Sequence, residues 1–426
     1  MAADNIAATR PTKTEQSSQE PSPPNAGAAR IAIAIAAAGY FVDLFDLILF
    51  SVVRVRSLTD LGVPKMELLD TGVRLLNFQM AGMLLGGILW GVLGDKRGRL
   101  SVLYGSIVLY SLANLANGFV DSVPVYAILR FLSGIGLAGE LGAGVTLAME
   151  MSAQRTRGNA TTIIATVGVM GAATAAVVGD LFPWRTAYIL GGVLGLSLLV
   201  LRMRLADSPM FARAKQAGVG RGRLSLLLFP RERLMRYLRV IAIGLPIWWT
   251  AAILITFSPE FGKNFGMTEI PTAGRAVLFY YLGLTAGDLA SGVISQLRKT
   301  RKQVIGLFVA GTAGLALAYF ALAPTSLPVF YIVCGLLGVA NGYWAVFMTM
   351  AAEQFGTNIR STVTTTVPNF VRGAVVPITL LFQALRPALG LNGAAIAVGI
   401  GVLAIAVLAL GGLEESYGRS MDFFEE

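Results

Sequence analysis

Long apolar runs, each of about twenty residues, limit most strongly how this chain folds. Residues 31–53, 276–297 and 394–412 are three of these runs. As a helix, each is long enough to cross a hydrocarbon layer about 30 Å thick. Charged residues make up only 14% of the chain, against about 25% in soluble domains. The pattern therefore predicts an all-α polytopic membrane protein and argues against a soluble helical bundle.

The chain divides into two sets of six spans, separated by a long basic connection. We expect a disordered cytoplasmic tail, a six-helix bundle, a basic cytoplasmic linker, a second six-helix bundle and a short cytoplasmic tail; these occupy residues 1–29, 30–204, 205–237, 238–412 and 413–426. The twelve transmembrane helices are predicted near residues 31–53, 72–94, 101–120, 124–148, 159–180, 184–203, 238–258, 275–297, 303–323, 328–351, 362–386 and 392–412.

Lysine and arginine gather in every second connection, after the second, fourth, sixth, eighth and tenth spans. Because basic loops stay in the cytoplasm, we expect a multi-pass protein of the inner membrane with both termini in the cytoplasm. Arg54, Arg56 and Lys65 lie in the first external loop and depart from this pattern. Topology accounts for the net charge of +10, so the charge does not indicate nucleic-acid binding.

The two sets of spans share sequence features, which indicates duplication and two pseudo-symmetric bundles. The glycines Gly82, Gly86 and Gly91 recur 201 positions later as Gly283, Gly287 and Gly292. The pattern Glu-x6-Arg follows both the fourth and the tenth span, as Glu150…Arg157 and Glu353…Arg360. Parallel six-helix repeats place a substrate site near the membrane midplane, between the halves.

Several motifs resemble those of the major facilitator superfamily, and the likeness covers the whole membrane portion. Residues 91–99, Gly-Val-Leu-Gly-Asp-Lys-Arg-Gly-Arg, resemble its loop motif between helices two and three. Residues 130–136, Arg-Phe-Leu-Ser-Gly-Ile-Gly, resemble its fourth-helix motif. The motifs in residues 150–158, 207–209 and 414–418 resemble the sugar-porter and metabolite–proton symporter branches. The resemblance implies a transporter that works by alternating access.

The resemblance also implies a cytoplasmic gate. In the family, the acidic residue matched here by Asp95 contacts the start of the eleventh helix and an arginine of the fourth, and holds the cytoplasmic side shut. A basic loop that only sets topology would explain the arginines but not Asp95. Gln296 takes the matching place in the second half, so we expect an asymmetric latch. The gating residues expected from the two copies are Gly91, Asp95, Arg97, Gly98, Arg99, Glu150, Arg157, Glu353 and Arg360.

Two further segments resemble the aromatic-acid–proton symporters. Residues 43–46, Asp-Leu-Phe-Asp, resemble their first-helix motif, with Leu44 in place of a glycine. Residues 369–377, which begin with Asn369, resemble their eleventh-helix pattern. The paired glutamines of sugar porters are missing from the seventh span, and the Gly-Pro motif of drug antiporters is missing from the fifth. Sugars and drug antiport are therefore disfavoured.

Ionisable side chains inside the spans are the candidates for proton coupling, because a charge at the bilayer centre costs about 2.5–3.5 kcal/mol. Asp43 and Asp46 lie about 20 and 24 Å from the cytoplasmic end of their helix, and Arg130 is expected at the level of Asp46. In sugar porters the matching Asp and Arg form the proton-coupling pair. An aspartate facing an external vestibule is the alternative. Glu140 is a proton site, a counter-ion for a cationic substrate, or the partner of an arginine.

Arg372 is the candidate anchor for a substrate, since its guanidinium offers a planar fork to a carboxylate. The alternative is a partner for a buried acid. Asp288, in the eighth span, is a weaker candidate for the same site. Aromatic residues either line a site for a flat organic acid or pack. The full set of predicted substrate-binding residues is Arg372, Trp248, Tyr280, Tyr343, Trp344, Asn369 and Asp288.

The residue types and motifs that the sequence lacks limit the mechanisms that it can use. The chain has no histidine, so proton-linked work falls to carboxylates. It has no Walker loop, paired metal-ligand histidines or nucleophile elbow, so we predict no enzyme activity, cofactor or metal. We predict a monomer that moves a small organic anion, a carboxylate, together with protons across the lipid bilayer. A carrier of cations or zwitterions, a uniporter or exporter, and a non-transporting membrane sensor remain as alternatives.

Overall fold

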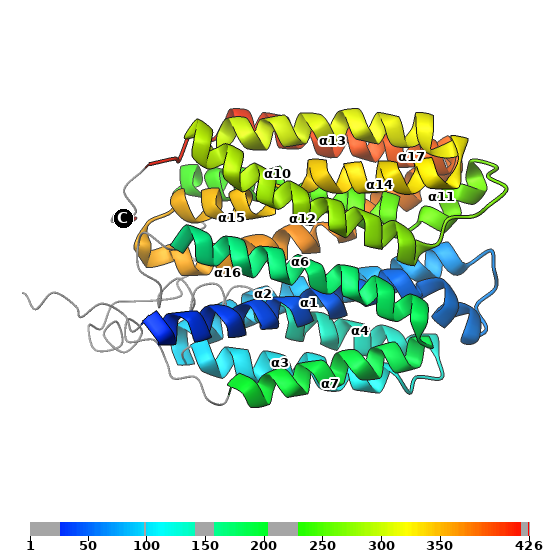
Figure 1. Ribbon diagram of the computed structural model, residues 1–426, viewed down its shortest axis with the longest axis horizontal. Coiled ribbons are helices and arrows are strands. Elements are labelled where there is room, and N and C mark those ends of the chain that lie inside the picture. The colour runs from blue at the N-terminus through cyan, green and yellow to red at the C-terminus, as the bar shows by residue number, and fades with distance from the viewer. Residues whose placement is uncertain (1–25, 98, 141–156, 203–228, 419–424, 426) are drawn as a thin grey trace, which may run out of the picture.

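The computed structural model describes residues 26–97, 99–140, 157–202, 229–418 and 425. Within these ranges every regular element is a helix. The helices form two layers, one built from each half of the sequence (Figure 1). The chain is therefore all-α in the part that the structure describes, as its apolar runs predict.

The first half supplies the lower layer of Figure 1. Its helices are α1 (Ala26–Asp60), α2 (Leu68–Arg97), α3 (Arg99–Asn117), α4 (Val123–Leu137), α6 (Arg157–Leu181) and α7 (Trp184–Arg202). The upper layer comprises α10 (Arg231–Trp249), a π-helix (Thr250–Ile255), α11 (Ser258–Asn264), α12 (Ala273–Arg298), α13 (Lys302–Leu322), a 3-10 turn (Ala323–Thr325), α14 (Leu327–Asn341), α15 (Trp344–Glu353), α16 (Thr357–Gly373) and α17 (Val375–Gly411).

Helix occupies each of the twelve predicted spans where the structure describes it. The eleventh and twelfth spans appear as one long stretch after Ala374, but Gly390 has a φ of 67° and a non-helical conformation, so the chain turns there. A φ in this region is adopted readily only by glycine. The fold is the predicted twelve-helix arrangement. The seventh span begins earlier than expected, at Arg231 rather than near residue 238.

In the described part of the chain, four spans are interrupted. The fourth turns at Ala138–Gly139, and the seventh passes into a π-helix at Thr250. The tenth breaks between α14 and α15, and the eleventh turns at Ala374. Backbone groups freed inside a membrane are tolerated where protein or a cavity surrounds them. These breaks therefore mark the level at which a site is expected.

The sequence repeat is also a packing repeat. Helix α2 packs on α4 in the first half as α12 packs on α14 in the second. A methyl group on Gly82 would overlap the carbonyl oxygen of Phe131, and one on Gly283 would overlap the carbonyl oxygen of Gly335. The helices in both pairs approach so closely that glycine is required at the contact. The glycine spacing in the sequence thus corresponds to one helix contact built twice.

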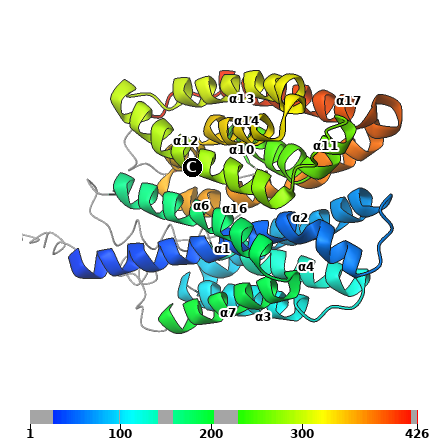
Figure 2. The ribbon, with the colours of Figure 1, turned by 45° about the vertical axis from the view of Figure 1, so that its right-hand side comes forward.

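The two halves meet along two lines of contact. Helix α2 packs against α16 and α17, and α6 packs against α12 (Figure 2). Helix α1 also contacts α12. The space between the halves is therefore bounded by helices of both, and this is where a transported solute would have to pass.

We expect Gly283→Ala to lower the thermal unfolding midpoint of the purified protein by several degrees, because the added methyl group forces α12 away from α14. Gly292→Ala is the matched control, since nothing lies within 4 Å of the position of its added methyl group. Differential scanning fluorimetry in detergent measures both. Equal midpoints for the two variants would contradict the packing argument.

Candidate functional site

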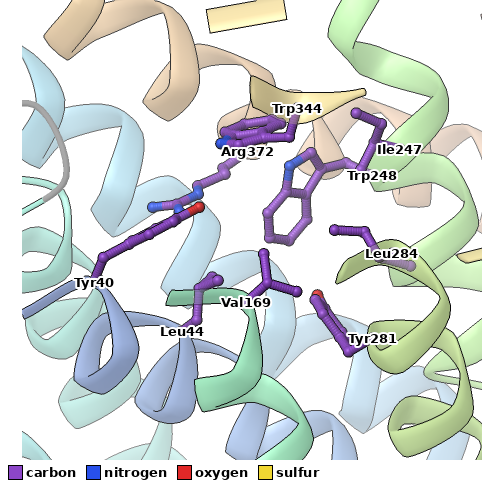
Figure 3. Close-up of a pocket in the computed structure, with 10 residues that line it drawn as sticks. Tyr40, Leu44, Val169, Ile247, Trp248, Tyr281, Leu284, Trp344 and Arg372 are labelled. Carbon is purple, nitrogen blue, oxygen red and sulfur yellow. The ribbon is translucent and has the colours of Figure 1, made fainter. Parts of the chain in front are cut away.

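A small cavity of about 30 Å³ lies between the halves. Its volume admits a water or two and is too small for an organic solute. Both halves line it: Tyr40 and Leu44 of α1, Val169 of α6, Ile247 and Trp248 of α10, Ala251 of the π-helix, Tyr281 and Leu284 of α12, Trp344 of α15 and Arg372 of α16 (Figure 3).

Arg372 is the charged residue of the cavity lining. Its Nη2 lies 3.4 Å from Oδ2 of Asp43, and both side chains are fully buried. The guanidinium carbon lies 5.8 Å from the ring centre of Trp248 and 6.0 Å from that of Trp344. The hydroxyl group of Tyr40 lies beside the guanidinium (Figure 3). Three predicted substrate-binding residues, Arg372, Trp248 and Trp344, thus come together from α16, α10 and α15.

Several donors at this cavity have no acceptor. Nε and Nη1 of Arg372, Nε1 of Trp248 and Nε1 of Trp344 are buried and have no hydrogen-bond partner among the described residues. A buried donor without an acceptor costs about 1–3 kcal/mol. The arrangement therefore favours a ligand that carries acceptor oxygens.

Tyr280 and Tyr343, two other predicted substrate-binding residues, lie outside the cavity lining. The Tyr280 hydroxyl donates to the backbone oxygen of Ile247 at 3.3 Å, and the Tyr343 hydroxyl donates to that of Ile243 at 2.9 Å. Both tyrosines are fully buried. Their contacts hold α12 and the start of α15 to α10, so their position is that of packing residues.

Asn369 joins the halves and does not line the cavity. Its Nδ2 donates to the backbone oxygen of Ala138 in the first half and to that of Thr365 on its own helix, both at 2.9 Å. Ala138 lies at the turn where the fourth span is interrupted. The amide therefore ties α16 to the turn of the fourth span across the halves.

Asp288 lies beside the break in the tenth span and binds the helix that begins there. Its Oδ1 accepts from the backbone N–H of Ala345 at 3.1 Å, at the start of α15. The first N–H groups of a helix have no partner within it, and a carboxylate there also complements the helix dipole. Asp288 thus caps α15 from a neighbouring helix, outside the cavity lining.

Arg130 and Asp46, predicted to lie at the same level, do not form an ion pair in the described part of the chain. Arg130 donates to Oε1 of Gln79 and to the hydroxyl of Tyr188, the latter at 3.3 Å, and lies 4.1 Å from the ring centre of Phe50. Asp46 is fully buried, and the side chain of Asn114 on α3 lies within hydrogen-bonding reach of its carboxylate. Hydrogen bonds hold Arg130 in place without Asp46.

Glu140 pairs with Arg202. Both carboxylate oxygens of Glu140 accept from the guanidinium, one of them from Nη1 at 2.9 Å, and both side chains are 1% exposed. Gly39 of α1 leaves no room for a side chain beside the pair. Of the three roles considered for Glu140, the geometry is that of a partner for an arginine.

Only part of the predicted gate lies in described residues. Gly98 and Glu150 lie outside them, as do the side chains of Asp95, Arg97, Arg99 and Arg157. Gly91 faces the methyl group of Thr366 on α16, across the halves. Arg360 donates to the backbone oxygens of Ala352 and Phe355.

Glu353 belongs to a cluster at the end of the second half. Arg301 bridges to it at 3.2 Å, and the Ser416 hydroxyl donates to it at 2.6 Å. Burial acts to raise the pKa of the neighbouring Glu415, but hydrogen bonds from Thr300 and from backbone N–H groups outweigh burial and lower that pKa below its ordinary value. The segment after α17 is thereby fixed to the turn between α12 and α13.

Two residues that contact the predicted ones, Tyr40 and Arg202, were not singled out from the sequence, whereas Tyr281 was among the aromatic candidates. Tyr40 lies on α1 three positions before Asp43, on the same helix face. This spacing could have identified Tyr40 as a neighbour of Asp43 in the site. Tyr281 lines the cavity although the adjacent Tyr280 does not, and only the rotation of α12 decides between them. Arg202, at the end of an apolar run, carried the same signal as the other ionisable residues within spans.

The model of the Major Facilitator Superfamily matches residues 36–374, which is most of the chain. The chain belongs to the Major Facilitator Superfamily. It is therefore a multi-pass membrane transporter for a small molecule, and it is not an enzyme.

Curated relatives and solved structures of the superfamily resemble this transporter along much of its length. The probable 4-methylmuconolactone transporter of Cupriavidus pinatubonensis is 28% identical over 337 residues, which cover 76% of each chain. The 3-(3-hydroxy-phenyl)propionate transporter of Escherichia coli is 29% identical over 275 residues, covering 57% of this chain and 66% of the relative. The crystal structure of a D-xylose-proton symporter has a TM-score of 0.70 at 17% identity, covering 92% of this chain and 99% of that one, and shows the shared fold.

Asp288→Ala should lower the thermal unfolding midpoint of the transporter by several degrees, because the N–H of Ala345 loses its acceptor. Asp288→Asn keeps an acceptor oxygen and should unfold near the wild-type temperature. Asp121→Ala is the matched control, since that side chain is 94% exposed. Similar midpoints for Asp288→Ala and Asp121→Ala would contradict the capping role.

Proposed function

We propose that this superfamily member is a proton-coupled symporter for a small organic carboxylate with a flat, apolar body. The observation that carries the proposal is the set of buried N–H donors around the central cavity, on Arg372, Trp248 and Trp344, that have no acceptor among the described residues. A carboxylate supplies two acceptor oxygens, and its geometry matches the fork of a guanidinium. Bound there, it would accept hydrogen bonds from donors that no described residue satisfies.

The walls of the cavity fit the body of such a ligand. The rings of Trp248 and Trp344 lie near the guanidinium, and Leu44, Val169 and Leu284 complete an apolar surface. Small-molecule sites commonly combine apolar and aromatic walls with a few polar groups that fix orientation. The name of the Escherichia coli relative, which specifies an aromatic carboxylate, supports the same substrate class. The cavity must widen to admit such a molecule.

A cationic substrate is less well supported by the charges of the site. Glu140 is engaged by Arg202, and one oxygen of Asp288 is engaged by α15. Asp43 faces Arg372, so the cavity itself is not a negative environment. The anion-binding reading therefore has the stronger geometric support.

Proton coupling falls to buried carboxylates, because the chain has no histidine. Asp43 lies at the cavity against Arg372, and Asp46 is buried one turn further along α1. Glu140 and Arg130, the other predicted coupling residues, are occupied by contacts within the first half. We therefore place the coupling on α1.

Orientation follows from the basic loops: both termini face the cytoplasm, and the carboxyl end of α1 faces outward. At that outer end Arg54 of the first half bridges to Glu260 of the second at 2.7 Å, and Arg54 is fully buried. Arg54 also donates to the backbone oxygen of Thr256. Arg54 lies on α1 and not in the first external loop, where the sequence had placed it. This external latch, Arg54–Glu260, accounts for its departure from the basic-loop pattern.

The substrate proposal is tested in proteoliposomes with an inward proton gradient. We expect uptake of labelled benzoate or 3-(3-hydroxyphenyl)propionate, and no uptake of benzylamine or xylose. Arg372→Lys keeps the charge but loses the fork, so it should raise KM for the carboxylate about tenfold or more. Arg56→Lys, at a half-exposed arginine remote from the cavity, is the control. An unchanged KM in Arg372→Lys would remove the anchor from the proposal.

The external latch is tested by distance measurement. Glu260→Gln leaves Arg54 without its counter-charge, so the outer ends of the halves should separate. Spin labels at Lys65 and Lys263, in a Cys334→Ala background that leaves no native thiol, should move apart in double electron–electron resonance. Asp60→Asn, which breaks an ion pair to Arg185 within the first half, should leave the distance unchanged. A distance that Glu260→Gln does not alter would show that Arg54–Glu260 does not hold this end closed.

A further inference from the structure

We propose that Tyr281 is a specificity-determining residue, which binds a hydroxyl group on the aromatic ring of the substrate at the end remote from the carboxylate. The inference rests on the proposed function, because it takes Arg372 as the anchor of that carboxylate. It narrows the substrate class from flat organic acids to aromatic acids that carry a hydroxyl group on the far edge of the ring.

Tyr281 and Arg372 line the same cavity from different helices, α12 and α16. In Figure 3 the two side chains lie at opposite sides of the lining, and the hydroxyl group of Tyr281 points inward, towards Val169 and Trp248. Arg372 acts on Tyr281 through its charge alone, whereas it reaches Tyr40 by a hydrogen bond. The hydroxyl of Tyr40 therefore belongs to the carboxylate end of the cavity, and that of Tyr281 belongs to the other end.

The hydroxyl group of Tyr281 makes no hydrogen bond to a described residue, although the side chain is only 5% exposed. The hydroxyls of Tyr280 and Tyr343 differ, because both donate to backbone oxygens of α10. A buried tyrosine hydroxyl usually has a partner. The rings of Tyr280 and Tyr281 pack edge to face with 5.2 Å between their centres, so packing accounts for the ring of Tyr281 but not for its hydroxyl group.

The rest of the lining offers little to a polar group on the ring. The apolar residues of the wall are Leu44, Val169, Ile247, Ala251 and Leu284. The indole N–H groups of Trp248 and Trp344 can only donate, whereas a tyrosine hydroxyl both donates and accepts. A ring hydroxyl that met the apolar wall would lose its hydration without a replacement. The cavity therefore favours a ring hydroxyl at Tyr281 and disfavours one elsewhere along the wall.

This arrangement predicts discrimination between closely related acids. With an unsubstituted ring, the hydroxyl of Tyr281 would stay buried without a partner, and a site of this kind selects against the analogue that lacks the hydrogen-bonding group. We expect wild-type kcat/KM for 3- or 4-hydroxybenzoate to exceed that for benzoate by about tenfold. The hydroxyl group of 2-hydroxybenzoate lies beside the carboxylate, at the Arg372 end, so it should bring no such gain.

Uptake of labelled benzoate and of the three hydroxybenzoates into proteoliposomes tests the inference. The wild-type order of the four acids is measured first and needs no variant. Tyr281→Phe removes only the hydroxyl group, so the ratio of kcat/KM for the preferred hydroxybenzoate to that for benzoate should fall to about one. Because both values of the ratio come from the same preparation, the ratio does not depend on how much of the variant folds.

Tyr280→Phe is the matched control, since it removes the same group from the adjacent tyrosine, which lies outside the cavity lining, and it should keep the wild-type ratio. A wild type without preference for 3- or 4-hydroxybenzoate over benzoate would overturn the inference and leave the carboxylate site standing. So would a ratio that Tyr281→Phe does not change, or one that Tyr280→Phe lowers equally. Failure of wild type to transport any aromatic carboxylate would instead refute the proposed function.

Discussion

The buried ion pair between Asp43 and Arg372 is the interaction on which the rest of this structure depends. Two full charges inside a bilayer are costly, and their cost is reduced only when each lies against the other. The pair joins the first half to the second at the central cavity. Any event that neutralises one partner therefore weakens the attraction between the halves and leaves the other charge unpaired at the cavity.

The other buried ion pairs of the membrane portion are of two kinds, those within one half and those between the halves. Glu140 and Arg202 lie in the same half and bond through both carboxylate oxygens, so their pair can persist while the halves move. Arg54 and Glu260 lie in different halves, so their pair must break if these ends of the halves separate. Where a charged pair lies relative to the boundary between the halves thus decides whether it is a fixed support or a part that moves.

Helix breaks supply the remaining polar groups of the centre. The interruption of the tenth span leaves the first N–H groups of α15 to be satisfied, and Asp288 accepts one of them. At the turn of the fourth span, the carbonyl of Ala138 accepts from Asn369 across the halves. Polar side chains that looked like substrate ligands in the sequence are therefore partly occupied by the backbone, because an unpaired backbone group in a membrane is expensive.

The sequence by itself predicted the twelve spans and the duplication of six helices. It also placed Arg372, Trp248 and Trp344 among the candidates for a central site. These depend on local properties: apolar length, glycine spacing and the cost of a charge within a span. Only the tertiary structure decided that Arg372 lies against Asp43, that Arg130 is held without Asp46, and that Tyr281 rather than Tyr280 lines the cavity. Those outcomes depend on how each helix is rotated about its axis and which helix it packs against, and the packing of the whole molecule sets both.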